Sequence, residues 1–137
     1  MGWGVAPAAV ATAVAKVRRA FDITTPSQAA AVASLDDVEE LQGRRSVNAE
    51  QRDVVVEILR RRGFECPTPA ANFVYAETGE DDAKPLFDAL LLQGVIVRPL
   101  AGFGASGAIR VTVGAPEENA FLDEALGRVG ALSGGMA

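Results

Sequence analysis

The chain has 137 residues, a formal net charge of −5, no histidine, one cysteine and two lysines. This length suits one domain that folds without disulfides, while the missing histidine excludes Ser-His-Asp and Cys-His chemistry and the single cysteine excludes a multi-cysteine zinc site. The acidic balance does not fit a nucleic-acid-binding protein, and no stretch resembles a signal peptide or a transmembrane helix, so we expect a cytoplasmic protein.

The N-terminal segment predicts a helix that follows a short extended stretch at residues 2–5. Pro7 suits the first helical position, and an alanine-rich segment follows it. The larger apolar side chains recur at intervals of three and four residues, which places them on one stripe: Val10, Val14, Val17 and Phe21. We expect the helix to pack through this stripe.

Two more helices are predicted before residue 65. Thr25 is the expected N-cap of the second, with Pro26 at the first helical position and Gln28 completing a capping box. The third is long and mostly polar, ends near residue 62, and has a point of interruption at Gly43. In its closing run RRRG, the arginines complement the helix dipole and Gly63 suits a left-handed C-cap, so we favour this local role over a binding patch.

The residues after 65 predict a small sheet with two helices. The prolines of CPTPA indicate a linker, and strand character is found at 72–77, 95–99 and 108–114. One helix lies between the first two strands and another begins at Pro116. The GFGASG segment lies between two strands, so it is a hairpin loop rather than a dinucleotide-binding turn. This order predicts an α/β (α+β) fold with a mixed three- to four-stranded sheet, covered by helices mainly on one face.

Two arginines are the candidate binding residues of this sheet. Side chains alternate along a strand, so Arg110 and Thr112 share one face, opposite the isoleucine and valines of the same strand, and Arg98 likewise lies opposite Val97. If the valine faces meet the helices, both guanidinium groups emerge on the open side, where they could grip a carboxylate or phosphate through paired hydrogen bonds. Alternation alone favours the other interpretation, in which both arginines only solvate the sheet.

Other polar residues give weaker signals. Lys16 and Lys84 are the only side-chain amines, and both fall in amphipathic helices where a solvated role is expected. Asn72 could orient a ligand, although an asparagine before a strand more often bonds to nearby backbone. The residues by themselves therefore indicate one anion-binding face at most.

Several segments, in a fixed order, resemble the C-terminal region of pyridoxal-phosphate-dependent class I/II aminotransferases, above all the histidinol-phosphate aminotransferase branch. They are GWGVAP, SQAAAVASLDD, ANFVY, GVIVRPL followed by GFG, and IRVTVGAPEEN running into FLDEAL. The resemblance covers about residues 2–126; FDITTPSQ departs from it. It implies that residues 1–25 are a remnant of the large domain with its connecting helix, that 26–130 form the small domain, and that 131–137 are a flexible tail.

The resemblance also implies roles for the two arginines. Arg110 would grip the anionic group of the substrate, which is a carboxylate in most aminotransferases and a phosphate in the histidinol-phosphate branch, and Arg98 would assist. The lysine that carries the cofactor would precede Met1, so no catalytic, cofactor-binding or metal-binding residue is assigned here. Because transamination needs that lysine, we expect an inactive C-terminal fragment that binds pyridoxal phosphate only within the intact enzyme.

Two alternatives and a set of partners complete the expectations. The chain could be a freestanding small-domain module that binds an anionic metabolite or a partner chain, or one half of a split enzyme with a separate large-domain chain. The intact enzyme would take a small-molecule amino donor that carries a phosphate or carboxylate. Apolar surface around Trp3, Val5 and the first helix predicts self-association, most simply as a homodimer. The particular donor, and whether Met1 is a true start, stay open.

Overall fold

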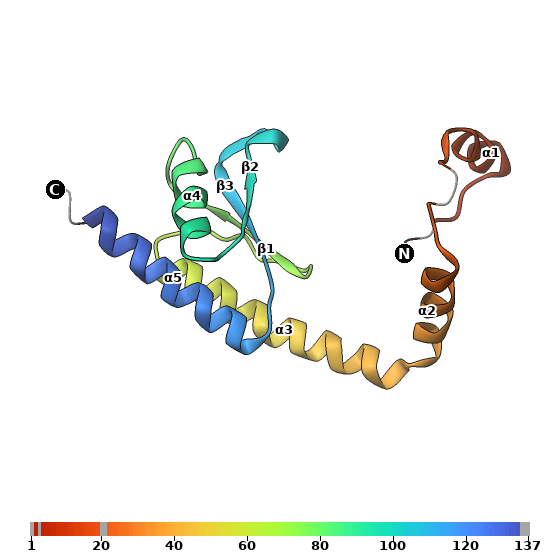
Figure 1. Cartoon of the computed structure of the whole chain (residues 1–137), viewed down its shortest axis with the longest axis horizontal. Helices are drawn as coiled ribbons and strands as arrows, with labels where there is room; N and C mark the ends of the chain where they lie inside the picture. The colour runs from red at the N-terminus through yellow and green to blue at the C-terminus, as the bar shows by residue number, and fades with distance from the viewer. Residues whose placement is uncertain (1, 3, 20–21, 135–137) are drawn as a thin grey trace. The chain divides into compact units, whose positions relative to one another are not determined.

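The computed structural model describes residues 2, 4–19 and 22–134, with side chains up to position 130. The chain divides into two compact units, Met1–Arg44 and Arg45–Ala137. Figure 1 labels the helices and strands along the chain. In order they are α1 Ala8–Val17, α2 Thr25–Asp36, α3 Val38–Arg61, β1 Phe73–Glu77, α4 Lys84–Leu92, β2 Arg98–Leu100, the 3₁₀ turn η1 Ala101–Phe103, β3 Ala105–Thr112 and α5 Pro116–Gly134.

The first unit contains α1, α2 and the beginning of α3. No residue of α1 or α2 is buried, and Val10, Val14 and Val17 are 50%, 58% and 81% exposed. The apolar stripe predicted for α1 is present, but the expectation that the helix packs through it is wrong for this chain. Phe21, its fourth member, lies outside the described residues, and residues 4–7 form no strand.

The start of α2 lies one residue earlier than predicted. The N-cap is Thr24, whose Oγ1 accepts a hydrogen bond from the Ser27 backbone N–H at 3.3 Å, and Pro26 lies in the first turn. Thr24 has extended backbone angles (φ −77°, ψ 156°), as an N-cap residue requires, whereas Thr25 is already helical. The capping interaction therefore joins Thr24 to Ser27, and not Thr25 to Gln28.

Helix α3 is long because both of its ends are capped and nothing breaks it between them. Asp37 Oδ1 accepts a hydrogen bond from the Glu40 backbone N–H at 3.2 Å, and Gly63 closes the other end with φ 86°. The helix passes through Gly43 without interruption. Arg60 and Arg61 lie in the last turn of the helix, and the predicted C-cap at Gly63 is confirmed. Arg60 donates to the Cys66 carbonyl at 2.8 Å, whereas Arg62 makes a long-range ion pair with Asp123 of α5 at 2.8 Å.

The second unit is built on a three-stranded sheet in the order β1-β3-β2. Both pairs are antiparallel, whereas the sequence suggested a mixed sheet. β2 begins at Arg98 and β3 at Ala105, so β2 is shorter and β3 longer than predicted. The pairing register shifts between Pro99 and Leu100, and the regular ladder of β2 ends there; β2 is an edge strand, where a proline is tolerated. Gly104, with φ 84°, completes the hairpin turn.

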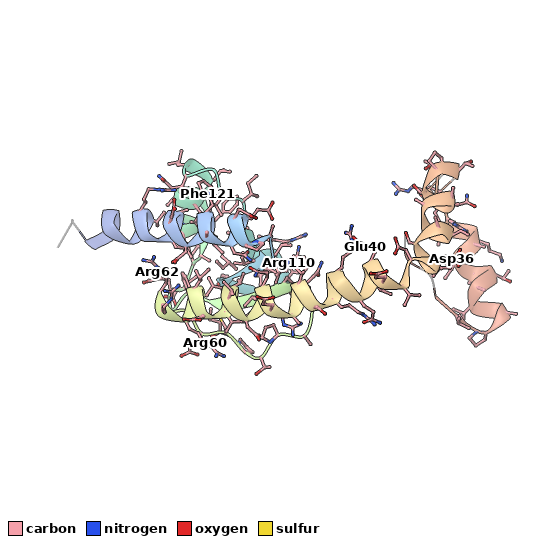
Figure 2. The ribbon with its side chains drawn as sticks, turned by 90° about the horizontal axis from the view of Figure 1, so that it is seen from below. Asp36, Glu40, Arg60, Arg62, Arg110 and Phe121 are labelled. Atoms are coloured by element: carbon pink, nitrogen blue, oxygen red, sulfur yellow. The ribbon has the colours of Figure 1, made fainter. Side chains whose placement is uncertain are left out.

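Helices α3, α4 and α5 cover one face of the sheet, as predicted, and together form the core. The views in Figures 1 and 2 both show α3 and α5 side by side. The sheet contributes alternate residues to this core, and each helix contributes leucines. The fully buried members include Val74, Ala76, Ile109, Leu59 and Leu90. Full burial of one such leucine or isoleucine stabilises the fold by about 1.5–3 kcal/mol.

A buried amide network fixes the corner where β3 leads into α5. Asn119 is 2% exposed; its Nδ2 donates to Gln51 Oε1 at 2.9 Å and to the Gly114 carbonyl at 3.0 Å. Its Oδ1 accepts from the Gly114 N–H at 3.1 Å. A Cβ at Gly114 would lie 2.9 Å from Glu118 Cβ and 3.2 Å from Asn119 Oδ1, so a larger residue here would have to displace the start of α5 and this network. The network joins α3 and α5 to the segment that follows β3, and α5 then continues to Gly134, into the segment predicted as a tail.

Candidate anion-binding site

Three polar side chains form a row across the open face of the sheet. In the strand register, Tyr75 of β1 lies opposite Arg110 of β3, and Arg110 lies opposite Arg98 of β2. On either side of Arg110, Ile109 and Val111 are buried against the helices, whereas Arg110 is half-buried and Arg98 is exposed. The predicted placement of both arginines on the uncovered face is therefore confirmed.

The hydrogen-bond pattern of the strands shows how closely neighbouring residues of the row approach each other. Val113 N–H donates to the Asn72 carbonyl and Thr78 N–H to the Gly107 carbonyl. In an antiparallel ladder, hydrogen-bonded and non-hydrogen-bonded pairs alternate along the strands. Tyr75 and Arg110 lie three positions from each of these bonded pairs, so they are a non-hydrogen-bonded pair, in which side chains approach most closely. The backbone of Arg110 then faces β2, so Arg110 and Arg98 are a hydrogen-bonded pair with a Cα separation of roughly 5.5 Å.

The two guanidinium groups lack acidic partners. Neither Arg98 nor Arg110 forms an ion pair with any residue that the structure describes, while Arg61 and Arg62 share Asp123 and Arg44 pairs with Glu40. Like charges directly opposite on neighbouring strands destabilise a sheet by roughly 0.2–1 kcal/mol. An anion between the two arginines would remove this repulsion and accept hydrogen bonds from both.

Aromatic and acidic residues border the row. Cζ of Arg110 lies 5.2 Å from the ring centroid of Phe73, and Cζ of Arg98 lies 5.0 Å from that of Phe103. The Tyr75 hydroxyl donates to Glu77 Oε1 at 3.0 Å. This hydrogen bond is the main reason that the pKa of Tyr75 is raised, with desolvation and the carboxylate charge adding to it. Tyr75 therefore stays protonated and neutral beside Arg110.

The structure places the other candidate residues outside this row. Lys84 Nζ donates to both carboxylate oxygens of Asp88 at 2.8 and 2.6 Å on the exposed side of α4, and Lys16 lies in the last turn of α1, where no residue is buried. Asn72 is exposed and uses its backbone carbonyl for Val113. GFGASG forms η1 and the beginning of β3, as the predicted hairpin loop requires.

The described residues do not fit a pyridoxal phosphate site of their own. A lysine that forms a Schiff base must offer its amine to the cofactor, and the amine of Lys84 is paired with Asp88 in solvent. Burial raises the pKa of the Cys66 thiol, with Arg60 opposing it, so this cysteine is a weak nucleophile. Among the described residues there is no group of acidic or cysteine side chains able to hold a metal ion, and no helix of the described part is long and apolar enough to cross a membrane.

Two residues of the site were not predicted from the sequence. Phe73 and Phe103 contact the arginines, but neither stands out in its segment. Alternation does place Phe73 on the same face as Tyr75. What the sequence does not provide is the register, which brings β1 next to Arg110, or the turn that carries Phe103 back to Arg98.

Comparison with known proteins identifies the class. Residues 1–129 match the family model described as Aminotransferase class I and II, so the chain belongs to this family, as its sequence motifs suggested. The chain is 38% identical over 130 residues to histidinol-phosphate aminotransferase 1 of Cupriavidus pinatubonensis, covering 93% of this chain and 35% of that protein. It is 38% identical over 129 residues to histidinol-phosphate aminotransferase 2 of Methylococcus capsulatus, covering 94% and 34%.

Solved structures agree with this assignment. Histidinol-phosphate aminotransferase from Sinorhizobium meliloti, solved in complex with pyridoxal-5'-phosphate, superimposes with a TM-score of 0.77 at 28% identity. The match covers 88% of this chain and 34% of that one. The chain therefore spans about a third of the length of the relatives that it matches.

Proposed function

We propose that this chain supplies the small-domain part of a cytoplasmic pyridoxal-phosphate-dependent aminotransferase of the histidinol-phosphate type. In this proposal Arg110, assisted by Arg98, binds the anionic group of the amino donor. The observation that carries it is the register of the sheet, which sets two arginines without acidic partners directly opposite each other on an open face. The 38% identity to histidinol-phosphate aminotransferases supports the choice of branch.

The role of this chain in the reaction is to bind and orient the substrate. A guanidinium group holds a carboxylate or phosphate through two parallel hydrogen bonds, which fixes direction as well as position. Two such groups suit a doubly charged phosphate, and the Tyr75 phenol beside them adds no charge. Pyridoxal phosphate supplies the electron sink of transamination when bound. Because Lys16 and Lys84 do not provide a suitable amine, the chain alone is proposed to be inactive.

A chimera tests this role directly. The segment of the Cupriavidus enzyme equivalent to residues 2–126 is replaced by this chain, and transfer from histidinol phosphate to 2-oxoglutarate is measured. We expect an active chimera whose kcat/KM falls about 100-fold in Arg110→Gln, since hydrogen bonds to charged groups are lost. Arg128→Gln is the matched control, because Arg128 lies on α5 and bonds Gln93. A fully active Arg110→Gln chimera contradicts the proposal.

The 137-residue chain by itself gives a second measurement. Mixed with pyridoxal phosphate, it should show neither the visible absorbance of a cofactor imine nor amino transfer. An imine on either lysine would overturn the assignment of the reactive amine to another part of the enzyme. A separate chain that carries this amine is a proposed partner; co-purification with such a chain would identify a split enzyme.

A freestanding anion-binding module is the second candidate function. The observation in its favour is that the whole row of Tyr75, Arg110 and Arg98 belongs to the second unit, Arg45–Ala137, which has its own core. This candidate predicts saturable binding of phosphate or carboxylate metabolites together with an inactive chimera. The aminotransferase proposal predicts an active one.

Self-association is also proposed. Val5 and Val17 are 89% and 81% exposed, and we propose that apolar surface exposed around them favours association. A homodimer is the simplest product. Light scattering tests it, and a monomer at micromolar concentration would contradict it.

A further inference from the structure

Each arginine of the row has its own aromatic ring. Arg110 on the central strand lies over Phe73 of β1, and Arg98 on the edge strand lies over Phe103 of η1. The face of an aromatic ring attracts a guanidinium group, and the contact removes rotamers from a long, flexible side chain. The two rings come from different segments, so the same arrangement is built twice at one site.

The Arg110 guanidinium is enclosed at its Nε edge. Its Nε is buried without a hydrogen-bond partner, whereas the residue as a whole is only half-buried. An unpartnered buried donor lowers stability. Its presence here indicates that the position of the guanidinium is set by packing. The edge of Arg110 that an anion can reach is therefore the end formed by the two terminal nitrogens.

We propose that Phe73 and Phe103 are positioning residues that present Arg110 and Arg98 to the anion end-on. This inference rests on the proposed function, because it takes the arginine pair to be the anion site. An arginine fixed before binding loses less side-chain freedom when the ligand arrives. Phe73 has the larger effect, because this residue is 37% exposed whereas Phe103 is 69% exposed.

The experiment uses the 137-residue chain, inorganic phosphate as probe and the NMR signals of arginine Nε–Hε groups. Two quantities are measured: hydrogen exchange of the Arg110 Nε–Hε without ligand, and the phosphate dissociation constant. In Phe73→Leu we expect faster exchange at Arg110 and phosphate binding weaker by about threefold to tenfold, the loss of a partly desolvated cation–π contact. Phe73→Trp keeps an aromatic face and should retain both properties. Phe103→Leu should weaken binding about twofold.

The chain offers a matched control for these variants. Cζ of Arg128 lies 5.7 Å from the ring centroid of Phe121, a third arginine–phenylalanine contact. Phe121 lies on α5, outside the row (Figure 2). Phe121→Leu should leave both the Arg110 exchange and the phosphate affinity unchanged. Unfolding midpoints of all variants show that the fold is retained, and Phe73→Trp provides a test even if Phe73→Leu unfolds.

The outcomes separate this inference from the proposed function. If the Arg110 exchange depends on the ring but phosphate does not bind, the ring orders Arg110 but the arginine pair is not an anion site, and the proposed site falls together with the positioning role that rests on it. If phosphate binds equally well to wild type, Phe73→Leu and Phe73→Trp, with unchanged exchange, the proposed site stands and the positioning role is overturned. Equal loss of affinity in Phe73→Leu and Phe121→Leu also overturns it, because the effect is then general.

Discussion

Residues 1–44 and residues 45–137 contain similar amphipathic helices with opposite outcomes. α1 and α4 are both short helices with an apolar face, yet α1 buries no residue while Leu90 of α4 is completely buried. The second unit supplies α4 with a sheet and a neighbouring helix, α5; the first unit has helices only. Sequence periodicity determines which side of a helix is apolar, but burial requires a surface that faces it.

The largest expected effect contrasts one core residue with one residue of the exposed stripe. Leu59→Ala removes a side chain that is 0% exposed in the second unit, and we expect the free energy of unfolding to fall by about 2–5 kcal/mol. Val14→Ala, at a position 58% exposed in the first unit, should change it by less than about 0.5 kcal/mol. Urea unfolding followed by circular dichroism measures both.

A large loss in Val14→Ala would break the comparison. It would show that the stripe of α1 is covered in solution, which self-association would explain. Repeating the measurement at two protein concentrations separates the cases, because the stability of an associated form depends on concentration.

A smaller effect concerns the ion pairs that join α3 to α5 in the second unit. The hydrogen bond from Arg62 is the main cause of the lowered pKa of Asp123; the charges of Arg61 and Arg62 add to it and desolvation opposes it. Because the folded pKa lies below the unfolded value, the stabilisation is complete above the unfolded pKa and is lost as pH falls through the folded one. We expect Asp123→Asn to remove a contribution of at most about 1 kcal/mol near neutral pH.

The measurement is the urea midpoint at about pH 6 and about pH 3, on either side of an ordinary aspartate pKa. The difference between the two values should be smaller in Asp123→Asn than in the parent chain. Asp88→Asn is the control, since Asp88 pairs with Lys84 inside a single helix. An unchanged pH difference in Asp123→Asn would show that this contact does not join the helices in solution.

Much of the second unit could be predicted from local patterns. The start of α5 at Pro116 and the left-handed Gly63 follow from short-range rules. Alternation also placed Arg110 and Arg98 on the open face. The sheet was predicted as mixed because strand direction depends on which strands pair, and that choice is made by contacts distant in the sequence.

Other features depend on a neighbour that the local sequence does not contain. The packing of α1 was predicted from its stripe, but no covering surface exists within the described residues of the first unit. The N-cap of α2 differed by one residue because TTPS offers two threonines and only backbone angles distinguish them. The rings of Phe73 and Phe103 become part of the site only through strand register and turn geometry.

The smallest effect concerns the open face of the sheet in the second unit, where two arginines lie opposite each other. Removing one of two opposed like charges should stabilise the fold by about 0.2–1 kcal/mol. We expect this gain when Phe103→Leu is compared with the double variant Phe103→Leu, Arg98→Gln. Neither of these proteins has the contact between Arg98 and the Phe103 ring, so only the charge differs between them. Arg61→Gln, which removes a partner of Asp123, should give no gain. Because salt screens charges, the gain should shrink in 1 M salt. A loss of stability in Arg98→Gln at low salt would contradict the prediction, because it would mean that the opposed arginines do not repel each other.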